Sequence, residues 1–282
     1  MFPAYAKINL GLLVLEKRLD GYHNIQTVFH RINLFDGLSL APSAGIAVIS
    51  SSSEAPSGES NICHKAARLL GEKLHVRDGV TITIDKKIPV GAGLGGGSSD
   101  AAAVLRRLPA FWGQSATTAL LHETALELGS DVPYFLGTGT ATAKGRGEIL
   151  DYFRLTLPFT VLLCHPNIHV ATAWAYGQIR PQPDREHIDL KDVIVRGIED
   201  PRVLNEQLVN DFESPVFRAY PEIGRLKDEM YASGAVYAAM SGSGSSVYGL
   251  FADSIEAEKL STLLRSRSYR TFLTPPLFLP AE

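Results

Sequence analysis

The chain has 282 residues, of which 45% are hydrophobic and 20% are charged, and its formal net charge is −3. This balance is typical of a globular protein with a sizeable core, and the absence of a basic stripe argues against nucleic acid as the main partner. The two cysteines, Cys63 and Cys164, are too few for a disulfide framework and do not form a metal-type pair.

The sequence also bears on where the protein works. The start, MFPAYAKINL, has no basic region followed by an apolar run, so we expect no secretory signal. Residues 232–252 carry no charge, but nine of these 21 residues are serine or glycine, which is a poor composition for a membrane helix. Because few cysteines favour a reducing compartment, we expect a cytoplasmic protein without a membrane partner.

The first segment of the chain predicts two strands joined by a turn. Residues 5–15 and 25–35 are mostly apolar. The Asp-Gly pair at 20–21 is a turn signal between them, and the Asp-Gly pair at 36–37 is expected to end the second strand.

A loop, two helices and a short strand are expected next. Residues 50–60 are rich in serine, glycine and proline, whereas residues 61–74 place apolar side chains at helical spacing. Residues 80–85 are rich in β-formers and predict a short strand. Residues 98–108 predict a helix that Pro109 closes.

The middle of the chain predicts one more helix and three more strands. Ser115 can cap a helix that stops at Gly129. Residues 138–143 and 148–153 have the composition of strands, and a buried strand is expected to start near Phe159.

The last third alternates helices with strands near Val236, Val247 and Thr271. Mixed strands and helices with hairpin signals indicate an α+β fold rather than a doubly wound parallel sheet. At ~150 residues per domain, the length fits two domains, and we place them at residues 1–155 and 156–282.

Residues 88–104, IPVGAGLGGGSSDAAAV, hold five glycines within the seven positions 91–97. Glycines ahead of a helix let the backbone approach an anion closely, and the first helical turn leaves amide groups unpaired. Ser98, Ser99 and Asp100 are good helix-capping residues. A flexible turn before a capped helix is the alternative, but five glycines in seven positions favour a phosphate-binding loop.

Two common phosphate loops fit this stretch poorly. Gly91, Gly93 and Gly96 match the dinucleotide pattern G-x-G-x-x-G, but residues 109–115 lack the acidic residue expected about 20 positions further on. No lysine follows the glycines as the Walker pattern requires.

Three segments resemble the motifs of the GHMP small-molecule kinases. The segments AYAKINLGLLV and KRLDGYHNIQTVF are similar to the first motif, the glycine stretch to the second, and AAMSGSGSSVYGLF to the third. LGSDVPYF and NDFE also resemble segments of that family, and the matches run from residue 4 to residue 251. The KINL, DGYH and GLGGGSSDAA forms resemble members that phosphorylate the 2-hydroxyl of a cytidine-diphosphate-linked methylerythritol in the non-mevalonate isoprenoid pathway.

The resemblance implies a two-domain fold, with an N-terminal domain like domain 2 of ribosomal protein S5 and a ferredoxin-like C-terminal domain. It also implies ATP with Mg²⁺ as the phosphoryl donor, and Asp100 or Ser99 could reach the Mg²⁺. We expect no metal site of the protein's own, because Pro166 separates His165 from His169. The residues implied to bind ATP are Asn61, Lys86, Pro89, Val90, Gly91, Ala92, Gly93, Leu94, Gly95, Gly96, Gly97, Ser98, Ser99 and Asp100.

Two charged residues are candidates for catalysis. Asp131 could take the proton of an acceptor hydroxyl, although a helix cap before Val-Pro also explains it. Lys7 lies in an otherwise apolar strand, where a surface lysine is the ordinary explanation. The resemblance implies that both are catalytic, and we expect Lys7 to orient Asp131 and to neutralise developing charge.

The resemblance further implies an acceptor site for a cytidine diphosphate group. Tyr22 would stack on the cytosine, His23 would hydrogen-bond it, and Tyr176 would be the second aromatic ring, with Thr172 as a neighbour and Asn9 as a further substrate contact. From the residues alone, Tyr22 and His23 could be ordinary side chains of a turn, and Tyr176 could be a core residue on a helix.

Other functions remain open at this stage. A related kinase acting on mevalonate or homoserine is one, but those acceptors carry no cytosine for the DGYH turn to bind. A dinucleotide-dependent oxidoreductase and an ATP-binding regulator without catalysis are others. The combined motifs favour a small-molecule kinase with no nucleic-acid partner.

Overall fold

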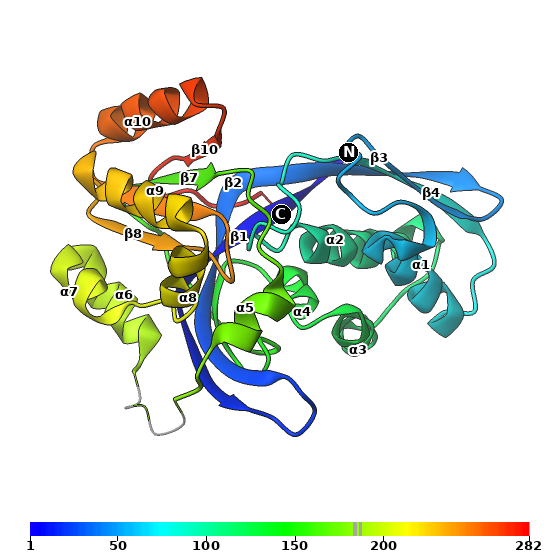
Figure 1. Ribbon diagram of the computed structural model, residues 1–282. Helices are drawn as coiled ribbons and strands as arrows, with labels where there is room; N and C mark the ends of the chain where they lie inside the picture. Colours follow the sequence, from blue (N-terminus) through cyan, green and yellow to red (C-terminus); the bar gives the residue numbers. More distant parts are fainter. Residues whose placement is uncertain (183–184, 186–187, 282) are drawn as a thin grey trace.

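The computed structural model describes residues 1–182, 185 and 188–281, and the chain builds two β-sheets covered by helices (Figure 1). The first sheet has six strands and the second has four. The strands of the first sheet are β1 (Phe2–Lys17), β2 (His23–Ser43), β3 (Ile46–Ser50), β4 (Gly79–Asp85), β5 (Thr140–Lys144) and β6 (Ile149–Phe153). Those of the second sheet are β7 (Thr160–His165), β8 (Tyr237–Met240), β9 (Val247–Phe251) and β10 (Arg270–Thr274).

Strand β2 is the spine of the first sheet. It pairs with β1 through residues 23–38, with β5 through residues 27–29 and with β4 through residues 37–43. The order is therefore β3-β4-β2-β5-β6 with β1 beside β2, and all pairs are antiparallel except β3 with β4. One strand thus runs from the DGYH turn to the region that leads into the glycine stretch.

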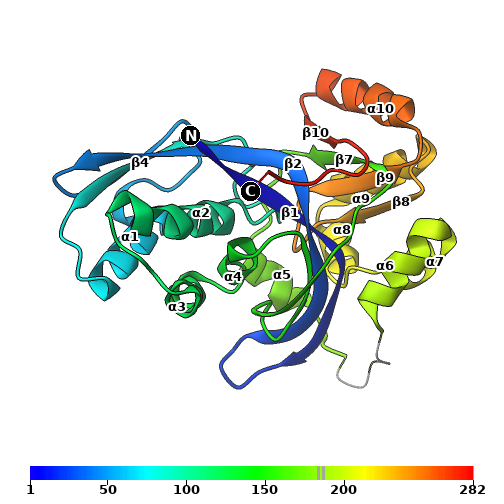
Figure 2. The same cartoon turned by 180° about the vertical axis from the view of Figure 1, so that it is seen from behind.

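The helices of the first half gather on one face of this sheet, as both views show (Figures 1 and 2). They bury small and aliphatic side chains, such as Ala101, Ala102 and Leu105 of α2, against the strands. This burial, at about 25 cal/mol per Å² of apolar surface, stabilises the layer. These helices are α1 (Ile62–Lys73), α2 (Gly96–Phe111), α3 (Thr118–Leu128) and α4 (Val132–Leu136).

The second sheet is fully antiparallel with the order β10-β7-β9-β8. Its central strand β7 is buried along its whole length, which agrees with its continuous apolar sequence. The first-to-last strands thus lie in the order 4-1-3-2, the expected ferredoxin-like arrangement, and the α+β prediction is confirmed. The helices of this half are α5 (Thr172–Gln178), α6 (Leu190–Glu199), α7 (Pro201–Gln207), α8 (Glu213–Ala219), α9 (Pro221–Ala232) and α10 (Ser254–Ser266).

The two sheets share a hydrophobic core. Ile8 and Leu10 of β1 belong to one buried cluster with Val161 of β7 and Leu250 of β9. This packing holds the β8–β9 loop against the glycine stretch of the first half. The boundary between residues 155 and 156, which falls between β6 and β7, stays a prediction.

The Asp36-Gly37 pair does not end a strand, contrary to the sequence prediction. β2 continues to Ser43 because the Asp36 carboxylate is fully buried and accepts hydrogen bonds from the amides of Lys87 (2.5 Å) and Ile88 (2.9 Å). An aspartate that is satisfied inside the fold can remain in a strand, and this one ties β2 to the entry of the glycine loop.

Helix α2 differs from its prediction at both ends. It begins at Gly96, and the capping position belongs to Gly95, so Ser98, Ser99 and Asp100 are not its caps. Pro109 lies inside the helix, which continues to Phe111 because the buried Leu108 and Trp112 keep its last turn in the core, with a bond of 2.9 Å from the Trp112 amide to the Leu108 carbonyl.

Other boundaries shift by a few residues. Thr117, not Ser115, caps α3, since its hydroxyl accepts a hydrogen bond of 3.2 Å from the Leu120 amide. Strand β3 had no sequence prediction, and it pairs with β4 in parallel.

In the described part of the chain, we find no helix with the length and apolar character that crossing a membrane requires.

Candidate active site

The glycine loop, residues 89–97, connects β4 to α2 and approaches the second half of the chain very closely. Gly93 has φ of +78°, and a Cβ atom there would lie 2.1 Å from the Ser241 carbonyl oxygen. Gly95 has φ of +69° and caps α2, where a Cβ atom would meet Phe135 at 2.9 Å. Only glycine fits these two positions, and the loop leaves the first amides of α2 available to an anion.

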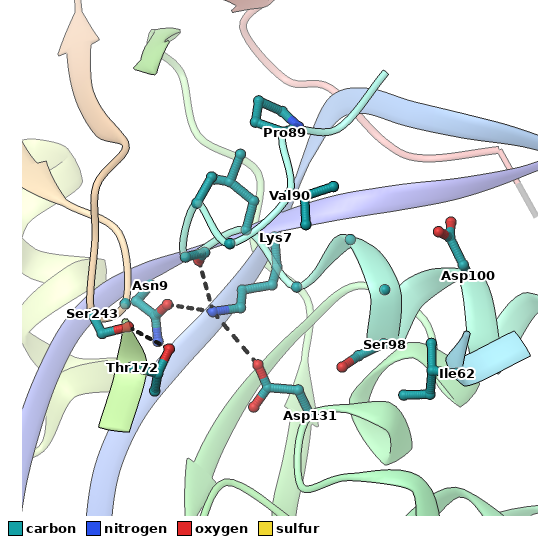
Figure 3. Close-up of a pocket in the computed structure, with 18 of the residues that line it drawn as sticks. Lys7, Asn9, Ile62, Pro89, Val90, Ser98, Asp100, Asp131, Thr172 and Ser243 are labelled. Carbon is teal, nitrogen blue, oxygen red and sulfur yellow. Dashed lines mark hydrogen bonds and ion pairs between the residues drawn. The ribbon is translucent and has the colours of Figure 1, made fainter. Parts of the chain in front are cut away.

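A cavity of about 470 Å³ opens beside this loop (Figure 3). It is lined by residues from both halves of the chain, which the shared core brings together. Among the candidate residues, Ser99, Tyr22 and His23 do not line it. Those that do are Lys7, Asn9, Asn61, Lys86, Pro89, Val90, Gly91, Ala92, Gly93, Leu94, Gly95, Gly96, Gly97, Ser98, Asp100, Asp131, Thr172 and Tyr176.

Lys7 is buried and points from β1 into this cavity (Figure 3). Its Nζ donates to Asn9 Oδ1 at 2.6 Å and to the Gly93 carbonyl at 3.1 Å, and it lies 3.7 Å from Asp131 Oδ2. Burial lowers the pKa of Lys7, and the Asp131 carboxylate opposes that shift. Lys7 is therefore not a surface lysine: it joins the glycine loop to Asp131.

Asn9 supports Lys7 from the same face of β1. Its Oδ1 accepts from Lys7, and its Nδ2 donates to Thr27 Oγ1 at 2.9 Å. The Thr27 hydroxyl in turn donates to the Gly11 carbonyl at 2.5 Å. Both polar ends of Asn9 thus have protein partners, which fixes its orientation and that of the Lys7 ammonium.

Asp131 occupies the capping position of α4, but its side chain makes no capping hydrogen bond. Its carboxylate is 34% exposed and faces Lys7 across the cavity (Figure 3). The helix-cap explanation therefore does not account for the carboxylate. One oxygen approaches an ammonium, and the group remains accessible to a ligand.

A buried charge cluster forms the wall of the cavity on the α2 side. Lys86 Nζ bonds Asp36 Oδ2 at 2.6 Å and Asp100 Oδ2 at 2.7 Å. Burial would lower the pKa of Lys86, but Asp100 and Asp36 together raise it. Burial raises the pKa of Asp100 to about 8, with help from Asp36 and against the effect of Lys86. One cation thus serves two carboxylates, and Asp100 holds its proton more tightly than an ordinary aspartate.

Besides Lys86 and Asp100, two more of the residues implied to bind ATP are engaged with the protein. Asn61 caps α1, since its Oδ1 accepts from the Cys63 amide at 2.8 Å, while its Nδ2 donates to the Pro56 carbonyl at 2.8 Å. The Ser99 hydroxyl donates to the Tyr5 carbonyl at 2.7 Å. Asn61 still lines the cavity, whereas Ser99 points toward β1.

The oxygen donors near the glycine loop fit a hard cation such as Mg²⁺ better than a soft metal. Ser98 and Asp100 line the cavity, and Asp100 Oδ1 is buried without a hydrogen-bond partner among the described residues. Those residues include no cluster of three histidine, cysteine, aspartate or glutamate side chains that could hold a metal alone.

The aromatic candidates lie at the opposite end from α2. The His23 ring stacks on Tyr176 with centroids 5.0 Å apart and planes at 21°, and Tyr176 also meets Phe212 edge-on. The Tyr22 ring is 53% exposed and lies under the Arg146 guanidinium, 4.8 Å from its centroid. The Thr172 and Ser243 hydroxyls lie 3.1 Å apart and line the same cavity as Tyr176 (Figure 3).

The sequence analysis missed Asp36 as a residue that positions this site, whereas Ser241 and Asn210 lie in segments that it compared with family motifs. Asp36 was interpreted as a turn residue, although it holds Lys86. The Ser241 hydroxyl donates to the Gly93 carbonyl at 3.0 Å, and Asn210 binds the Met240 and Gly242 carbonyls, so the NDFE segment shapes the β8–β9 loop. The motifs mark the segments of Ser241 and Asn210 but not their hydrogen-bond partners, and no local pattern indicates the contact of Asp36, because it joins segments far apart in the chain.

Arg146 was missed as well, although it lines the cavity beside Asp131. A Cβ atom on the neighbouring Gly147 would lie 3.5 Å from Asp131 Oδ1. The one local signal was a cation between two glycines, GRG, in a turn between two strands.

Comparison with known proteins agrees with this geometry. Residues 61–139 match the family model described as GHMP kinases N terminal domain, and residues 196–269 match GHMP kinases C terminal. Both halves therefore carry the domains of one class of small-molecule kinase, and the glycine loop lies within the first match.

Full-length relatives are more specific. The chain is 43% identical to a 4-diphosphocytidyl-2-C-methyl-D-erythritol kinase of Chlorobium limicola, over 98% of this chain and 96% of that protein. A crystal structure of 4-(cytidine 5'-diphospho)-2C-methyl-D-erythritol kinase is 35% identical, with a TM-score of 0.81 and 97% of each chain covered. A homoserine kinase of Cytophaga hutchinsonii, 18% identical with a TM-score of 0.69 over 96% of this chain and 94% of its own, shares the fold alone. The chain belongs to the 4-diphosphocytidyl-2-C-methyl-D-erythritol kinase family of the GHMP kinases.

Proposed function

We propose that the protein transfers the γ-phosphoryl group of ATP to the 2-hydroxyl of 4-diphosphocytidyl-2-C-methyl-D-erythritol, a step of the non-mevalonate isoprenoid pathway. The observation that carries the proposal is the position of Lys7, whose ammonium contacts the Gly93 carbonyl of the glycine loop and lies 3.7 Å from Asp131. A donor phosphate at the loop and an acceptor hydroxyl at the carboxylate would then meet beside one buried cation.

The reaction follows from these positions. The acceptor hydroxyl gives its proton to Asp131, and its oxygen forms a bond to the γ-phosphorus while the bond to the β,γ-bridging oxygen breaks and ADP leaves. Lys7 and the first amides of α2 stabilise the negative charge that develops on the phosphoryl oxygens. Asn9 keeps the Lys7 ammonium in place through its 2.6 Å hydrogen bond.

The donor would lie with its phosphates over residues 91–98 and its nucleoside toward Asn61 and Lys86, which line the same cavity. Ser98 and Asp100 line the cavity and would be the residues to hold Mg²⁺ there, with Asp100 Oδ1 buried and without a hydrogen-bond partner among the described residues; Ser99 is a poorer candidate because its hydroxyl bonds to Tyr5. When bound, the cation supplies positive charge to the β- and γ-phosphates.

On the acceptor side, the cytosine would bind among Tyr22, His23 and Tyr176. Thr172 lines the cavity between these rings and the β8–β9 loop. An aromatic face under a base contributes about 1–3 kcal/mol.

The test is ADP release with three acceptors: the cytidine-diphosphate compound, mevalonate and homoserine. We expect turnover with the first alone and a product phosphorylated at the 2-hydroxyl, read by NMR. Asp131→Asn should lose turnover while it keeps ATP binding. Asp151→Asn, a substitution of the same kind on the exposed part of β6, should behave as wild type. Equal rates with all three acceptors, or full turnover of Asp131→Asn, would contradict the proposal.

A further inference from the structure

A second groove lies where the two sheets meet, at a contact between β2 and β10 that both views show (Figures 1 and 2). The Asn33 amide of β2 donates a hydrogen bond of 2.8 Å to the Thr274 hydroxyl of β10 there. The groove has a volume of about 610 Å³ and is lined by residues 33–35, residues 86–87, Arg265 and residues 269–272. The proposed function gives this groove no ligand.

The groove collects positive charge. Lys87, Arg265 and Arg270 line it, and no aspartate or glutamate side chain lines it in the part of the chain that the structure describes. These cations gather although the net charge of the chain is −3. A cleft lined by charges of one sign concentrates its electric field and attracts counter-ions. The groove is therefore suited to an anion.

The nearby carboxylates neutralise these cations only weakly. Lys87 Nζ lies 3.4 Å from Asp85 Oδ2, and Arg270 Nη1 lies 3.7 Å from Glu54 Oε2, and in both pairs the side chains are exposed. Exposed ion pairs of this kind contribute about 0–1 kcal/mol. An anion in the groove can therefore compete for both cations.

The two arginines are oriented by contacts that leave donors for a ligand. Arg265 donates from Nε to Thr271 Oγ1 at 2.7 Å and from Nη2 to the Thr271 carbonyl at 3.3 Å, and it makes no ion pair with a described residue. Arg270 Nη2 donates to the Lys87 carbonyl at 3.0 Å. Because a guanidinium carries five N–H groups, each arginine keeps several for an anion.

The groove shares a wall with the candidate active site but offers cations of its own. Lys86 lines both. Its ammonium is held by Asp36 at 2.6 Å and by Asp100 at 2.7 Å, so it adds no free charge to the groove. The three free cations lie outside the lining of the active-site cavity.

The number of cations bears on the ligand. One phosphate group on an organic molecule carries a charge of about −1.5 to −2 at pH 7, which is less than three cations can neutralise. Two linked phosphates match them better, and each guanidinium can donate paired hydrogen bonds to phosphate oxygens. The half-buried rings of Phe35, Tyr269 and Phe272 line the same groove and offer apolar surface to an organic group.

We propose that this groove binds a small molecule that carries a diphosphate, at a site separate from those of ATP and the acceptor. The diphosphate contacts Lys87, Arg265 and Arg270. An organic group, where the ligand has one, packs on the aromatic rings. The inference does not depend on the reaction proposed above.

The experiment is a calorimetric titration of the protein with inorganic pyrophosphate, in the presence of a non-hydrolysable ATP analogue that occupies the glycine loop. We expect Arg265→Gln to weaken binding about 10- to 100-fold, because a charged hydrogen-bond donor is lost. Lys87→Gln should weaken binding about 3- to 10-fold, since its ammonium is more exposed. Inorganic phosphate should bind about tenfold more weakly than pyrophosphate, because it engages fewer cations.

The matched control is Arg267→Gln. Arg267 lies on the same turn as Arg265, but it bonds Glu229 at 2.9 Å and does not line the groove, so pyrophosphate binding should stay unchanged. Thermal unfolding checks the fold of each variant, and Lys87→Gln carries the test if Arg265→Gln does not fold. No binding by the wild type, no weakening in the groove variants, or equal weakening in Arg267→Gln would overturn the inference.

A further titration distinguishes two sources of the diphosphate. Butyl diphosphate should bind more tightly than pyrophosphate if the aromatic rings hold an organic group, whereas equal or weaker binding would assign the site to the free ion; both outcomes support the site. The result is distinct from that of the proposed function. Absence of ADP release with the cytidine-diphosphate acceptor would contradict the reaction and leave these titrations valid.

Discussion

The two ends of the cavity are built differently. At the donor end, the backbone of Gly93 is pressed against Ser241, and Lys86 is locked between two buried carboxylates. At the acceptor end, Tyr22 is 53% exposed and Arg146 has only a loose ion pair. The donor end is therefore formed before ligand binds, whereas the acceptor end has side chains that can rearrange.

The aromatic stack makes this contrast concrete. A base held between two rings needs their centroids roughly 7 Å apart, twice the ~3.5 Å contact distance. His23 and Tyr176 lie 5.0 Å apart, so a cytosine cannot slide between them without moving one ring. The acceptor must therefore either displace one of these rings or bind outside the stack.

The largest effect is expected from removing the Lys7 ammonium, which lies between the donor end and the acceptor end of the cavity. Lys7→Met keeps the apolar stem but deletes the ammonium that contacts Gly93 and Asp131. We expect kcat to fall about 10²- to 10³-fold, because charge stabilisation of the transferred group is lost. Steady-state kinetics measures it, with circular dichroism to check the fold. An unchanged kcat would mean that phosphoryl transfer does not take place beside Lys7.

Gly93→Ala tests the rigidity of the donor end. The new Cβ atom would overlap the Ser241 carbonyl and occupy a left-handed conformation, and we expect a loss of about 2–4 kcal/mol in the free energy of unfolding. Gly97→Ala is the matched control, since its Cβ atom would meet Ile62 at an ordinary 3.7 Å. Urea denaturation measures the free energy of unfolding of both variants. Equal values would show that the glycine loop can shift to accommodate the new side chain.

Tyr176→Leu tests the acceptor end. We expect the KM for the acceptor to rise about tenfold, as the loss of base stacking predicts, with the KM for ATP unchanged. Kinetics with each substrate varied in turn gives both values. A parallel rise in the KM for ATP would argue that the two ends do not act separately.

Asp100→Asn probes the charge cluster through pH. The folded protein holds the Asp100 proton up to a pKa of about 8, whereas an unfolded chain releases it near 3.8. The folded state therefore binds the extra proton between these values, and this stabilisation is lost as pH rises, by up to about 1.4 kcal/mol per pH unit.

His30 and His165, whose pKa values burial lowers to about 4, contribute a slope of opposite sign below about pH 6.5 in both proteins. The contribution of Asp100 is therefore the difference in unfolding free energy between wild type and the asparagine variant, which should fall as pH rises from about 4 to 8. Chemical denaturation of the ligand-free protein at several pH values measures it. An unchanged slope would assign the titration to another group.

The sequence predicted the elements well where apolar spacing governs them. The strand at β7 and the helix at α1 follow directly from burial on one or both faces. The sequence prediction was wrong at Asp36, which was expected to end a strand, and at Pro109, which was expected to end a helix. Buried hydrogen bonds and core packing keep both residues inside their elements. The glycine loop and the segments around Ser241 and Asn210 were visible because their motifs are local, but the contacts of Asp36 and Arg146 were not, since only the folded chain brings these residues to the site.

The contact between Gly93 and Ser241 also constrains how substrates enter. Around it, the Asn9 amide donates to the Ser241 hydroxyl at 3.3 Å, the Tyr248 hydroxyl donates to the Asn9 carbonyl at 2.9 Å, and the Ser246 amide donates to the Ala92 carbonyl at 3.3 Å. These hydrogen bonds join the two halves of the chain beside the cavity. We therefore expect the two halves of the chain to keep their relative position at this contact while substrates enter and products leave.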